Sequence, residues 1–436
     1  MFTQCILFRP IMSLKKKLLI ITPYMPYPLN GGGQIAQFEI NDSIRQNLDI
    51  TLIFPVRSEN IEDFKTLTSK WPDIVFRPYH PSRYQHFRYL ALKTWNHGFC
   101  FRFKVVLDRL LGLRKDADAN DEAVIKSTLV YKSDTVDPGL VSHILNEISK
   151  TNFDIVQIEF SDLLPLIRFL PKHIKRIFVH HELRFARDYS ELKILSSPYP
   201  LLEKLWARNK SIEINNLQQY DLVIALSNED KSKLAPYLGD EKILVSPFVI
   251  RARATQLQPF VFGNKLIFIG GQGHFPNKDG LCWFVTTCWK KLRESFPNLQ
   301  LHVVGEWDLQ SIEWHKEYSG ITFLGYVDNL EEACANGISI IPIRIGSGIR
   351  MKIIETINIG IPFVTTTIGV EGLNFQNERD CIISDTPEGF SESISRIILT
   401  QELGPRLSSN AKSTLETEYS YDKIIEKRLS AYKGIK

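Results

Sequence analysis

Short apolar runs alternate with longer amphipathic stretches along most of the chain. The runs are rich in β-branched residues and end at glycine, proline or polar residues, as expected of strands buried on both faces of a parallel sheet. In the first half they lie at 18–22, 50–54, 154–158, 177–179, 222–226 and 243–245, and in the second half at 266–269, 299–304, 321–324, 338–343, 363–366 and 381–383. Two such series predict an α/β protein with two Rossmann-like, doubly wound parallel-sheet domains that face a cleft.

The boundaries of these domains follow from where the alternation stops. Residues 251–263 lack a clear period and are typical of a linker, so we expect domains at 14–255 and 256–412. Residues 77–132 interrupt the first series, and we interpret them as a basic and aromatic helical insertion. Residues 1–11 precede Met12, a lysine cluster and the first strand, and we expect them to be a disordered extension or an upstream start.

The stretch 338–373 combines a buried strand, a glycine turn, a helix predicted over 349–359 and a second strand. Gly348, Lys352 and Glu355 are spaced to share one helix face, and Arg350 lies in the first turn. Two cations at a glycine-opened helix N-terminus indicate a phosphate site, and a carboxylate one turn on can accept hydrogen bonds from sugar hydroxyls. The alternative is a solvated helix face that carries a Lys–Glu pair.

Two further glycine-rich turns follow predicted strands. Gly31–Gly33 precedes a helix at 34–46, where a ligand can approach the backbone closely, although an ordinary flexible turn has the same composition. Gly271 and Gly273 begin like a dinucleotide-binding turn, but Pro276 stands where the third glycine belongs. Neither turn supports a dinucleotide cofactor.

Composition narrows the class of protein. With 436 residues, 44% hydrophobic and 23% charged, the chain has the profile of a soluble globular protein of two domains. A net charge of +4 argues against nucleic acid as the main partner. The six cysteines are scattered without a zinc or disulfide spacing, which indicates a reducing compartment.

Three polar segments have alternative interpretations. His180-His181-Glu182 follows a predicted strand, and a single histidine in a polar cleft explains it better than zinc, because adjacent residues on a strand point opposite ways. Asp116 and Asp118 form a D-x-D, which a solvated loop explains best. Residues 77–115 interleave basic and aromatic side chains, and they fit either an anionic membrane surface or helices with their aromatic side chains facing the core.

A series of motifs in the second half resembles a known family. The segments are GGQGHFPNKDGL at 270–281, VVG at 303–305, FLGYV at 323–327, PIRIGSGIRMKIIE at 342–355 and GIPFVTTTIGVEGL at 360–373. Together they resemble the donor-binding half of a group 1 (family 4) retaining glycosyltransferase with the GT-B fold, over roughly residues 262–436. The first half matches more loosely, through the glycine loop, the histidine after a strand and DLVIALS at 221–227.

This resemblance implies a nucleotide sugar, with UDP or GDP, in the C-terminal domain and a glycan, lipid-linked or polysaccharide acceptor on the N-terminal one. Arg350 and Lys352 would meet the diphosphate and His180 the reacting sugar, with His181 as the fallback, so the expected catalytic set is His180, Arg350 and Lys352. The expected donor-binding set is Gly32, Gly33, Gly271, Gly273, Lys278, Gly346, Ser347, Gly348, Glu355 and Glu371.

The chain departs from the family pattern at two positions. Gln272 replaces an arginine of the diphosphate loop, and Ser347 replaces a glutamate that serves the sugar in related enzymes. These departures keep two alternatives open, a catalytically lapsed binding or scaffold protein and a nucleotide-sugar epimerase, although no carboxylate pair for an epimerase is apparent.

The resemblance also implies features of mechanism and location. We expect no cofactor and no metal, because side-chain cations and a helix dipole would neutralise the leaving diphosphate. Same-face attack is expected, because no carboxylate stands out as a nucleophile. The C-terminal helix at 413–436 would return to the N-terminal domain. A cytoplasmic enzyme of polysaccharide or lipopolysaccharide biosynthesis is expected, and residues 77–115 would allow peripheral contact with the inner face of the membrane.

Overall fold

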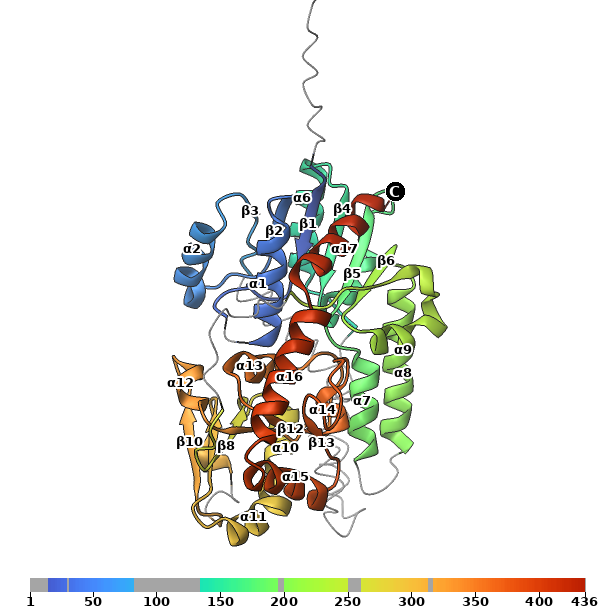
Figure 1. Ribbon diagram of the computed structural model, residues 1–436. Helices are drawn as coiled ribbons and strands as arrows, with labels where there is room; N and C mark the ends of the chain where they lie inside the picture. The colour runs from blue at the N-terminus through green and yellow to red at the C-terminus, as the bar shows by residue number, and fades with distance from the viewer. Residues whose placement is uncertain are drawn as a thin grey trace, which may run out of the picture.

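The computed structural model describes residues 15–29, 31–81, 134–194, 200–249, 260–312 and 317–435, and it contains two parallel sheets, one above the other (Figure 1). The upper sheet has the strand order β3-β2-β1-β4-β5-β6-β7, and the lower one β10-β9-β8-β11-β12-β13. Two Rossmann-like parallel-sheet domains were predicted, and the structure confirms this fold class.

The N-terminal domain alternates strands and helices as the pattern predicts. Its strands are β1 (Lys17–Ile21), β2 (Asp49–Ile53), β3 (Val75–Phe76), β4 (Ile155–Glu159), β5 (Lys175–His180), β6 (Leu222–Ala225) and β7 (Ile243–Val245). Its helices are α1 (Gly32–Ile44), α2 (Ile61–Lys70), α6 (Pro138–Lys150), α7 (Arg184–Lys193), α8 (Pro200–Leu217) and α9 (Asn228–Leu238), with 3-10 turns η1 (Ser58–Asn60), η4 (Ser161–Arg168) and η5 (Asp240–Lys242). Most of the expected insertion at 77–132 lies outside the described residues.

The C-terminal domain repeats the arrangement. Its strands are β8 (Lys265–Ile269), β9 (Gln300–Val304), β10 (Ile321–Gly325), β11 (Ile338–Ile341), β12 (Phe363–Thr365) and β13 (Ile382–Ile383). Its helices are α10 (Phe275–Phe284), continued by a π-helical turn (Val285–Trp289) and α11 (Lys290–Ser295), then α12 (Leu330–Cys334), α13 (Met351–Ile359), α14 (Thr367–Val370), α15 (Pro387–Leu399) and α16 (Leu403–Glu418), with a 3-10 turn at Leu309–Ser311.

Two helix starts differ from the sequence prediction, one after β8 and the other after β11. The spacing of apolar residues predicts an amphipathic helix over 279–296, but α10 begins at Phe275, because Pro276 occupies a first-turn position that needs no backbone N–H. The helix expected from 349 begins at Met351, with Arg350 as its extended N-cap. Gly348 therefore lies in the preceding turn, and the prediction that it shares a helix face with Lys352 was wrong.

The two faces of the upper sheet have separate cores, because side chains alternate along a strand. Leu18 and Ile20 of β1 face the α1 side, and Leu19 and Ile21 face the α6 and α8 side. The α1-side core continues into the C-terminal domain through residues such as Ile353 of α13. The domains are thus joined by apolar packing as well as by chain connections.

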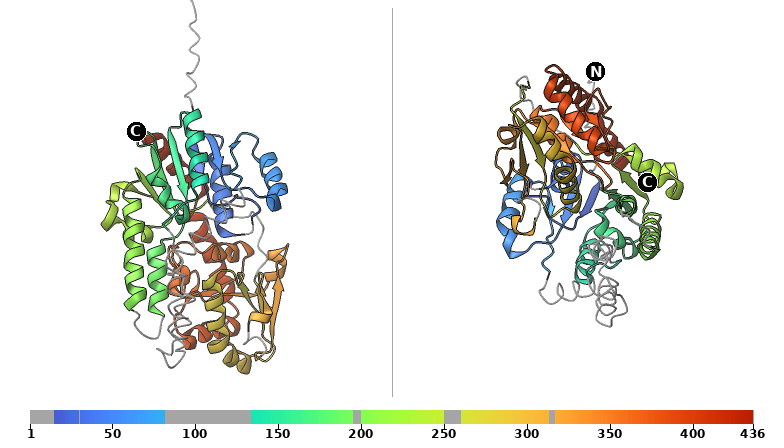
Figure 2. Two further views of the ribbon diagram at one scale, coloured as in Figure 1. Left: turned by 180° about the vertical axis from the view of Figure 1, so that it is seen from behind. Right: turned by 90° about the horizontal axis from the view of Figure 1, so that it is seen from below.

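The C-terminal segment links the two domains. A C-terminal helix was expected at 413–436, but the chain breaks at Tyr419 and Ser420, between α16 and α17 (Tyr421–Gly434). α16 packs on the lower domain, where Ser408 donates to the Gly360 carbonyl at 2.7 Å. α17 lies against the upper sheet, and α7 and α8 project downward beside the lower domain (Figures 1 and 2). Within the described residues no helix is both long and apolar enough to cross a bilayer.

Gly280 of α10 provides a test of the packing in the lower domain. A Cβ added there would overlap the carbonyl oxygen of Pro342, a backbone atom that cannot move aside without shifting the end of β11. We expect Gly280→Ala to lower the free energy of unfolding by about 1–3 kcal/mol, measured as a drop in thermal midpoint. Gly434→Ala is the control, because a Cβ at Gly434 has no neighbour within 4 Å. Equal midpoints for the two variants would contradict this packing.

Candidate functional site

The turn 346–348 of the lower domain contacts the upper domain directly. The Gly346 amide donates to Ser190 Oγ at 3.0 Å, and Ser347 Oγ donates to the Leu183 carbonyl at 2.8 Å. Gly348 has a φ of +77°, and a Cβ there would lie 2.7 Å from the carbonyl oxygen of His181. Glycine is therefore required at this position by backbone conformation and by space. Ser347, expected at the donor, instead has its hydroxyl in a contact between the domains.

Two cations follow this turn at the start of α13. The Arg350 guanidinium folds back to donate to the Gly348 carbonyl at 2.5 Å and to the Ser347 carbonyl. Lys352 Nζ donates to Asn277 Oδ1 at 2.7 Å and lies 5.0 Å from the centre of the Phe268 ring. Burial lowers the pKa of Lys352 to about 7, an effect that Glu355 opposes and Arg350 reinforces. An anion bound here would restore the charge on Lys352.

Acidic residues from both domains surround Arg350. Burial lowers the pKa of its guanidinium, while Glu182, Glu371, Asp230 and Glu229 act in the opposite direction. The carboxylates stabilise a positive charge that has little access to water. Since Arg350 already donates to carbonyl groups of its own turn, it can approach a phosphate only with its remaining donors or after a rotamer change.

Glu371, expected among the donor-binding residues, is held by the upper domain. Its carboxylate pairs with Lys233 of α9, which also pairs with Glu229 at 3.1 Å. Burial and the neighbouring Glu229 raise the pKa of Glu371, and Lys233 lowers it. The structure thus places Glu371 in an ion-pair cluster between the two domains.

The two adjacent histidines lie on opposite faces of the sheet, and each pairs with a buried glutamate. His180 is the last residue of β5, is 1% exposed and has its Nε2 3.0 Å from Glu213 Oε1. Glu213 also accepts from the amides of Arg184 and Phe185, so the pair secures the start of α7. This buried position does not suit the expected contact of His180 with a sugar. His181 lies on the other face, with its carbonyl against Gly348, and the structure thus places the fallback residue at the domain interface.

At Gly32 and Gly33 of the first loop, the backbone lies close to side chains of other segments. A Cβ at Gly32 would lie 2.8 Å from Met351 Cγ of α13, and a Cβ at Gly33 would lie 2.5 Å from the Tyr24 hydroxyl. The N-termini of α1 and α13 therefore meet across the interface. The expected contact of these glycines with the donor stays a prediction, since the neighbours seen are protein atoms.

The loop after β8 is tied to the loop after β9. Gln272 Nε2 donates to Ser311 Oγ at 2.7 Å, and Gln272 Oε1 accepts from the Asp308 amide at 2.7 Å. Gln272 thus does not reach toward Lys352. A cavity of about 590 Å³ lies beside this loop, lined by Gly271, Gln272, Gly273, Glu306, Trp307, Asp308 and Ser311.

The remaining expected donor residues lie on helices near this loop. Lys278 is exposed in the first turn of α10, next to Asn277, the partner of Lys352. Glu355 lies one turn after Lys352 on α13, and its charge acts on the Lys352 ammonium group. Lys352, Asn277 and Glu355 therefore form one group, while Gly271 and Gly273 line the neighbouring cavity.

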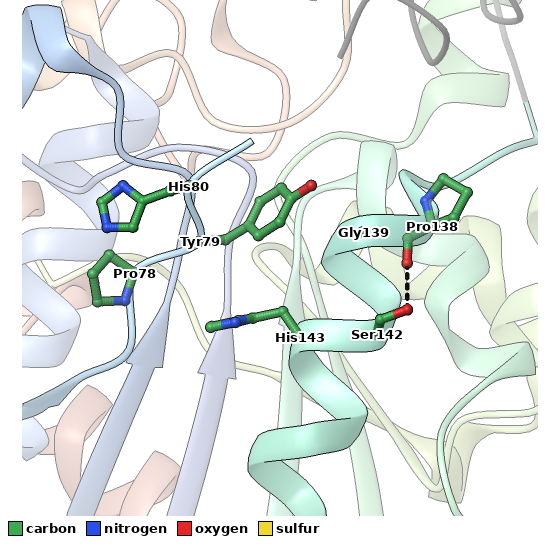
Figure 3. Close-up of a pocket in the computed structure, with 7 residues that line it drawn as sticks. All are labelled: Pro78, Tyr79, His80, Pro138, Gly139, Ser142 and His143. Carbon is green, nitrogen blue, oxygen red and sulfur yellow. Dashed lines mark hydrogen bonds between the residues drawn. The ribbon is translucent and has the colours of Figure 1, made fainter. Parts of the chain in front are cut away.

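A second cavity of about 510 Å³ opens at the edge of the upper sheet, between the residues after β3 and the first turns of α6 (Figure 3). Tyr79, His80, Ser142 and His143 contribute its polar groups. The Tyr79 hydroxyl, however, donates to Asp137 at 3.0 Å and is buried. The cavity lies at the carboxyl end of β3, the end of the sheet that faces the lower domain.

Within the described ranges, no group of three or more histidine, cysteine, aspartate or glutamate side chains is arranged to hold a metal ion. Asp116 and Asp118 lie outside the described residues.

Sequence and structure comparisons agree with this architecture. Residues 263–400 match the family model of the glycosyl transferases group 1. The chain has the GT-B fold. None of the curated sequences compared with the chain matches it.

Several solved structures share the whole arrangement at low sequence identity. TarM has a TM-score of 0.64 and 12% identity, over 97% of this chain and 99% of that chain. Anabaena HepE in complex with UDP and glucose has a TM-score of 0.62 and 11% identity, over 95% and 99%. A structure of trehalose-6-phosphate from E. coli bound with UDP-2-fluoro glucose has a TM-score of 0.58 and 14% identity, over 96% of this chain and 99% of that chain.

Several residues of the site were missed by the sequence analysis. Asn277 and Phe268 contact Lys352, and the former lies within the quoted segment at 270–281. Lys233 and Ser190, which contact the lower domain from α9 and α7, carry no local signal, because their role depends on how the domains dock.

The pKa of Lys352 leads to a binding prediction. Above pH 7 the lysine is mainly neutral when no anion is bound, so UDP, used as a diphosphate probe, should take up a proton if it binds here, and its affinity should fall as pH rises from 7 to 9. The fall can reach about tenfold per pH unit. Calorimetry in buffers of different ionisation enthalpy measures the uptake.

Matched variants show whether this proton belongs to Lys352. Lys352→Met should abolish the uptake, and Lys291→Met, an exposed lysine of α11, should preserve it. UDP binding without proton uptake at pH 8 would refute the assignment of an anion site at Lys352.

Proposed function

We propose that the protein is a retaining glycosyltransferase that moves a sugar from a nucleotide sugar to a glycan, lipid-linked or polysaccharide acceptor. The observation that carries this proposal is the pair Arg350 and Lys352 at the start of α13, of which Arg350 lies among carboxylates of the other domain. The group 1 match over 263–400 and the GT-B fold support it.

The proposed chemistry follows from charge. When the bond between the sugar and the diphosphate breaks, negative charge develops on the leaving phosphate oxygen. The Lys352 ammonium group, the Arg350 guanidinium and the free amides at the start of α13 would stabilise it in a site with little water. Glu355, one turn further along α13, is proposed to accept hydrogen bonds from the donor ribose.

His181, rather than His180, is proposed to contact the reacting sugar. Its side chain is 10% exposed, against 0% for His180, and its Nδ1, like that of His180, has no hydrogen-bond partner within the described part of the protein. A buried acceptor of this kind is costly unless a ligand hydroxyl or water satisfies it. Its place beside the turn 346–348 suits a sugar held at the start of α13.

UDP is the first nucleotide to test. A structure of S. aureus TarM contains UDP, as does one of Anabaena HepE, so a UDP sugar is the proposed donor, with a GDP sugar as the alternative. We also propose a cytoplasmic location with peripheral membrane contact through 77–115; residues 82–133 lie outside the described ranges.

The proposal predicts transfer that depends on Lys352. Purified protein incubated with UDP and GDP sugars and an acceptor library should release nucleotide and yield a glycosylated product, detected by mass spectrometry. Lys352→Met should lower kcat/KM by on the order of 10²- to 10³-fold, the scale for removing one charge-stabilising group.

Lys291→Met again serves as the control and should retain full activity. Normal transfer by a folded Lys352→Met variant would reject the catalytic assignment. UDP binding without hydrolysis or transfer from any donor would instead favour the scaffold alternative, and inversion of a sugar centre without an acceptor would favour the epimerase.

The mechanism makes a separate prediction about the product. We propose same-face attack without a metal, because side-chain cations and a helix N-terminus can neutralise the leaving group. A reaction run in EDTA should proceed at the normal rate, and NMR coupling constants should show that the product keeps the anomeric configuration of the donor. An inverted product, or loss of rate that Mg²⁺ or Mn²⁺ restores, would contradict this mechanism.

A further inference from the structure

A row of buried polar side chains connects α17 with His181. The Tyr432 hydroxyl donates to Gln157 Oε1 at 2.6 Å, and Gln157 Nε2 donates to Glu159 Oε1 at 2.6 Å. The other carboxylate oxygen of Glu159 lies 2.6 Å from His181 Nε2. Tyr432 and Gln157 are fully buried, and Glu159 is 2% exposed.

The geometry of the strands explains how this row forms. Gln157 and Glu159 are two residues apart on β4, so both point to the face that α17 covers (Figure 1). On β5 the same alternation sends Ile177 and Val179 to this face, and His181 continues it beyond the end of the strand. Helix α17 is therefore connected to His181 by hydrogen bonds through Gln157 and Glu159 of β4.

The charge of Glu159 depends in part on α17. Burial alone would raise the pKa of this carboxyl group, but the hydrogen bond from His181 and the charge of Arg428 help to hold it below its usual range. Arg428 is 1% exposed and is fixed by Ser246, to which its Nε donates at 3.0 Å. A buried carboxylate needs such compensation to stay ionised.

An ionised Glu159 determines the proton position on His181. A carboxylate can only accept, so Nε2 of His181 must carry the proton, and in the neutral ring Nδ1 keeps its lone pair. Phe160 stacks on the ring at 3.8 Å between centroids with planes 8° apart, and Phe248 stacks at 5.8 Å. The ring is thus held in place while Nδ1 remains without a partner among the described residues.

We propose that Tyr432 and Arg428 of α17 are positioning residues, which hold His181 in its Nε2–H form so that Nδ1 accepts a hydrogen bond from a sugar hydroxyl. The identity of that ligand rests on the proposed function, but the tautomer does not. A C-terminal helix that merely fastens to the upper sheet would have no influence on the His181 proton.

NMR of protein labelled with ¹⁵N in its histidines tests this proposal without substrate. In the unaltered protein, His181, assigned by the loss of its signals in His181→Gln, should show a protonated Nε2 and an unprotonated Nδ1. Tyr432→Phe removes one oxygen atom, frees the Gln157 amide to turn, and should add a population with the proton on Nδ1. Arg428→Met should do so more strongly.

Two matched variants control for general effects on the helix region. Tyr419→Phe removes a hydroxyl that accepts from the Asn374 amide, and Lys427→Met removes an exposed cation next to Arg428. Both should leave the His181 signals unchanged. In transfer assays, Tyr432→Phe should lower kcat by on the order of tenfold with little change in the KM for donor, and neither control should.

The outcomes separate this inference from the proposed function. A His181 tautomer that is Nδ1–H in the unaltered protein, or signals identical in Tyr432→Phe and the unaltered protein, would overturn the inference even if transfer is observed. The expected tautomer shifts in a protein that transfers no sugar would support the inference and reject the function. Should Arg428→Met fail to fold, Tyr432→Phe alone decides.

Discussion

The candidate site depends on the contact between the turn 346–348 and the residues that follow β5. Gly348 lies so close to the His181 carbonyl that no side chain fits, and Gly346 and Ser347 hydrogen-bond to Ser190 and Leu183 of the opposite domain. Because α13 begins directly after this turn, its position brings Arg350 and Lys352 to the junction. The continuous apolar core on the α1 side holds the two sheets in the same relation.

This packing buries two cationic side chains, and nearby carboxylates offset the cost of burial to a different extent at each. Arg350 is surrounded by carboxylates of both domains, whereas the pKa of Lys352 falls to about 7. The charges of the protein therefore leave Lys352 partly neutral near pH 7, and the negative charge of a bound diphosphate would stabilise its protonated form. The Glu371–Lys233 pair shows a different use of charge, since it joins α9 to the lower domain.

Much of the fold could be predicted from the hydrophobic pattern, because parallel strands buried on both faces need unbroken apolar runs. The first residues of α10 and α13 were harder to predict from the sequence. Pro276 begins a helix as readily as it ends one, and Arg350 has no side-chain feature that marks it as an N-cap. At the site, Arg350, Lys352 and Glu355 could be identified from spacing after a glycine turn, while Asn277, Lys233 and Ser190 became apparent only in the folded chain.

The sequence by itself determined the two-sheet architecture and the cationic start of α13, since both depend on residues that are neighbours along the chain. Only the tertiary structure distinguishes the surroundings of His180 and His181. The alternation of a strand sends them to opposite faces of the sheet, and the residue that each one meets depends on what the fold brings to that face, Glu213 for His180 and Glu159 for His181. The same is true of Ser347 and Glu371, whose polar groups are engaged by the other domain. Contacts of this kind join segments more than a hundred residues apart, so no local pattern encodes them.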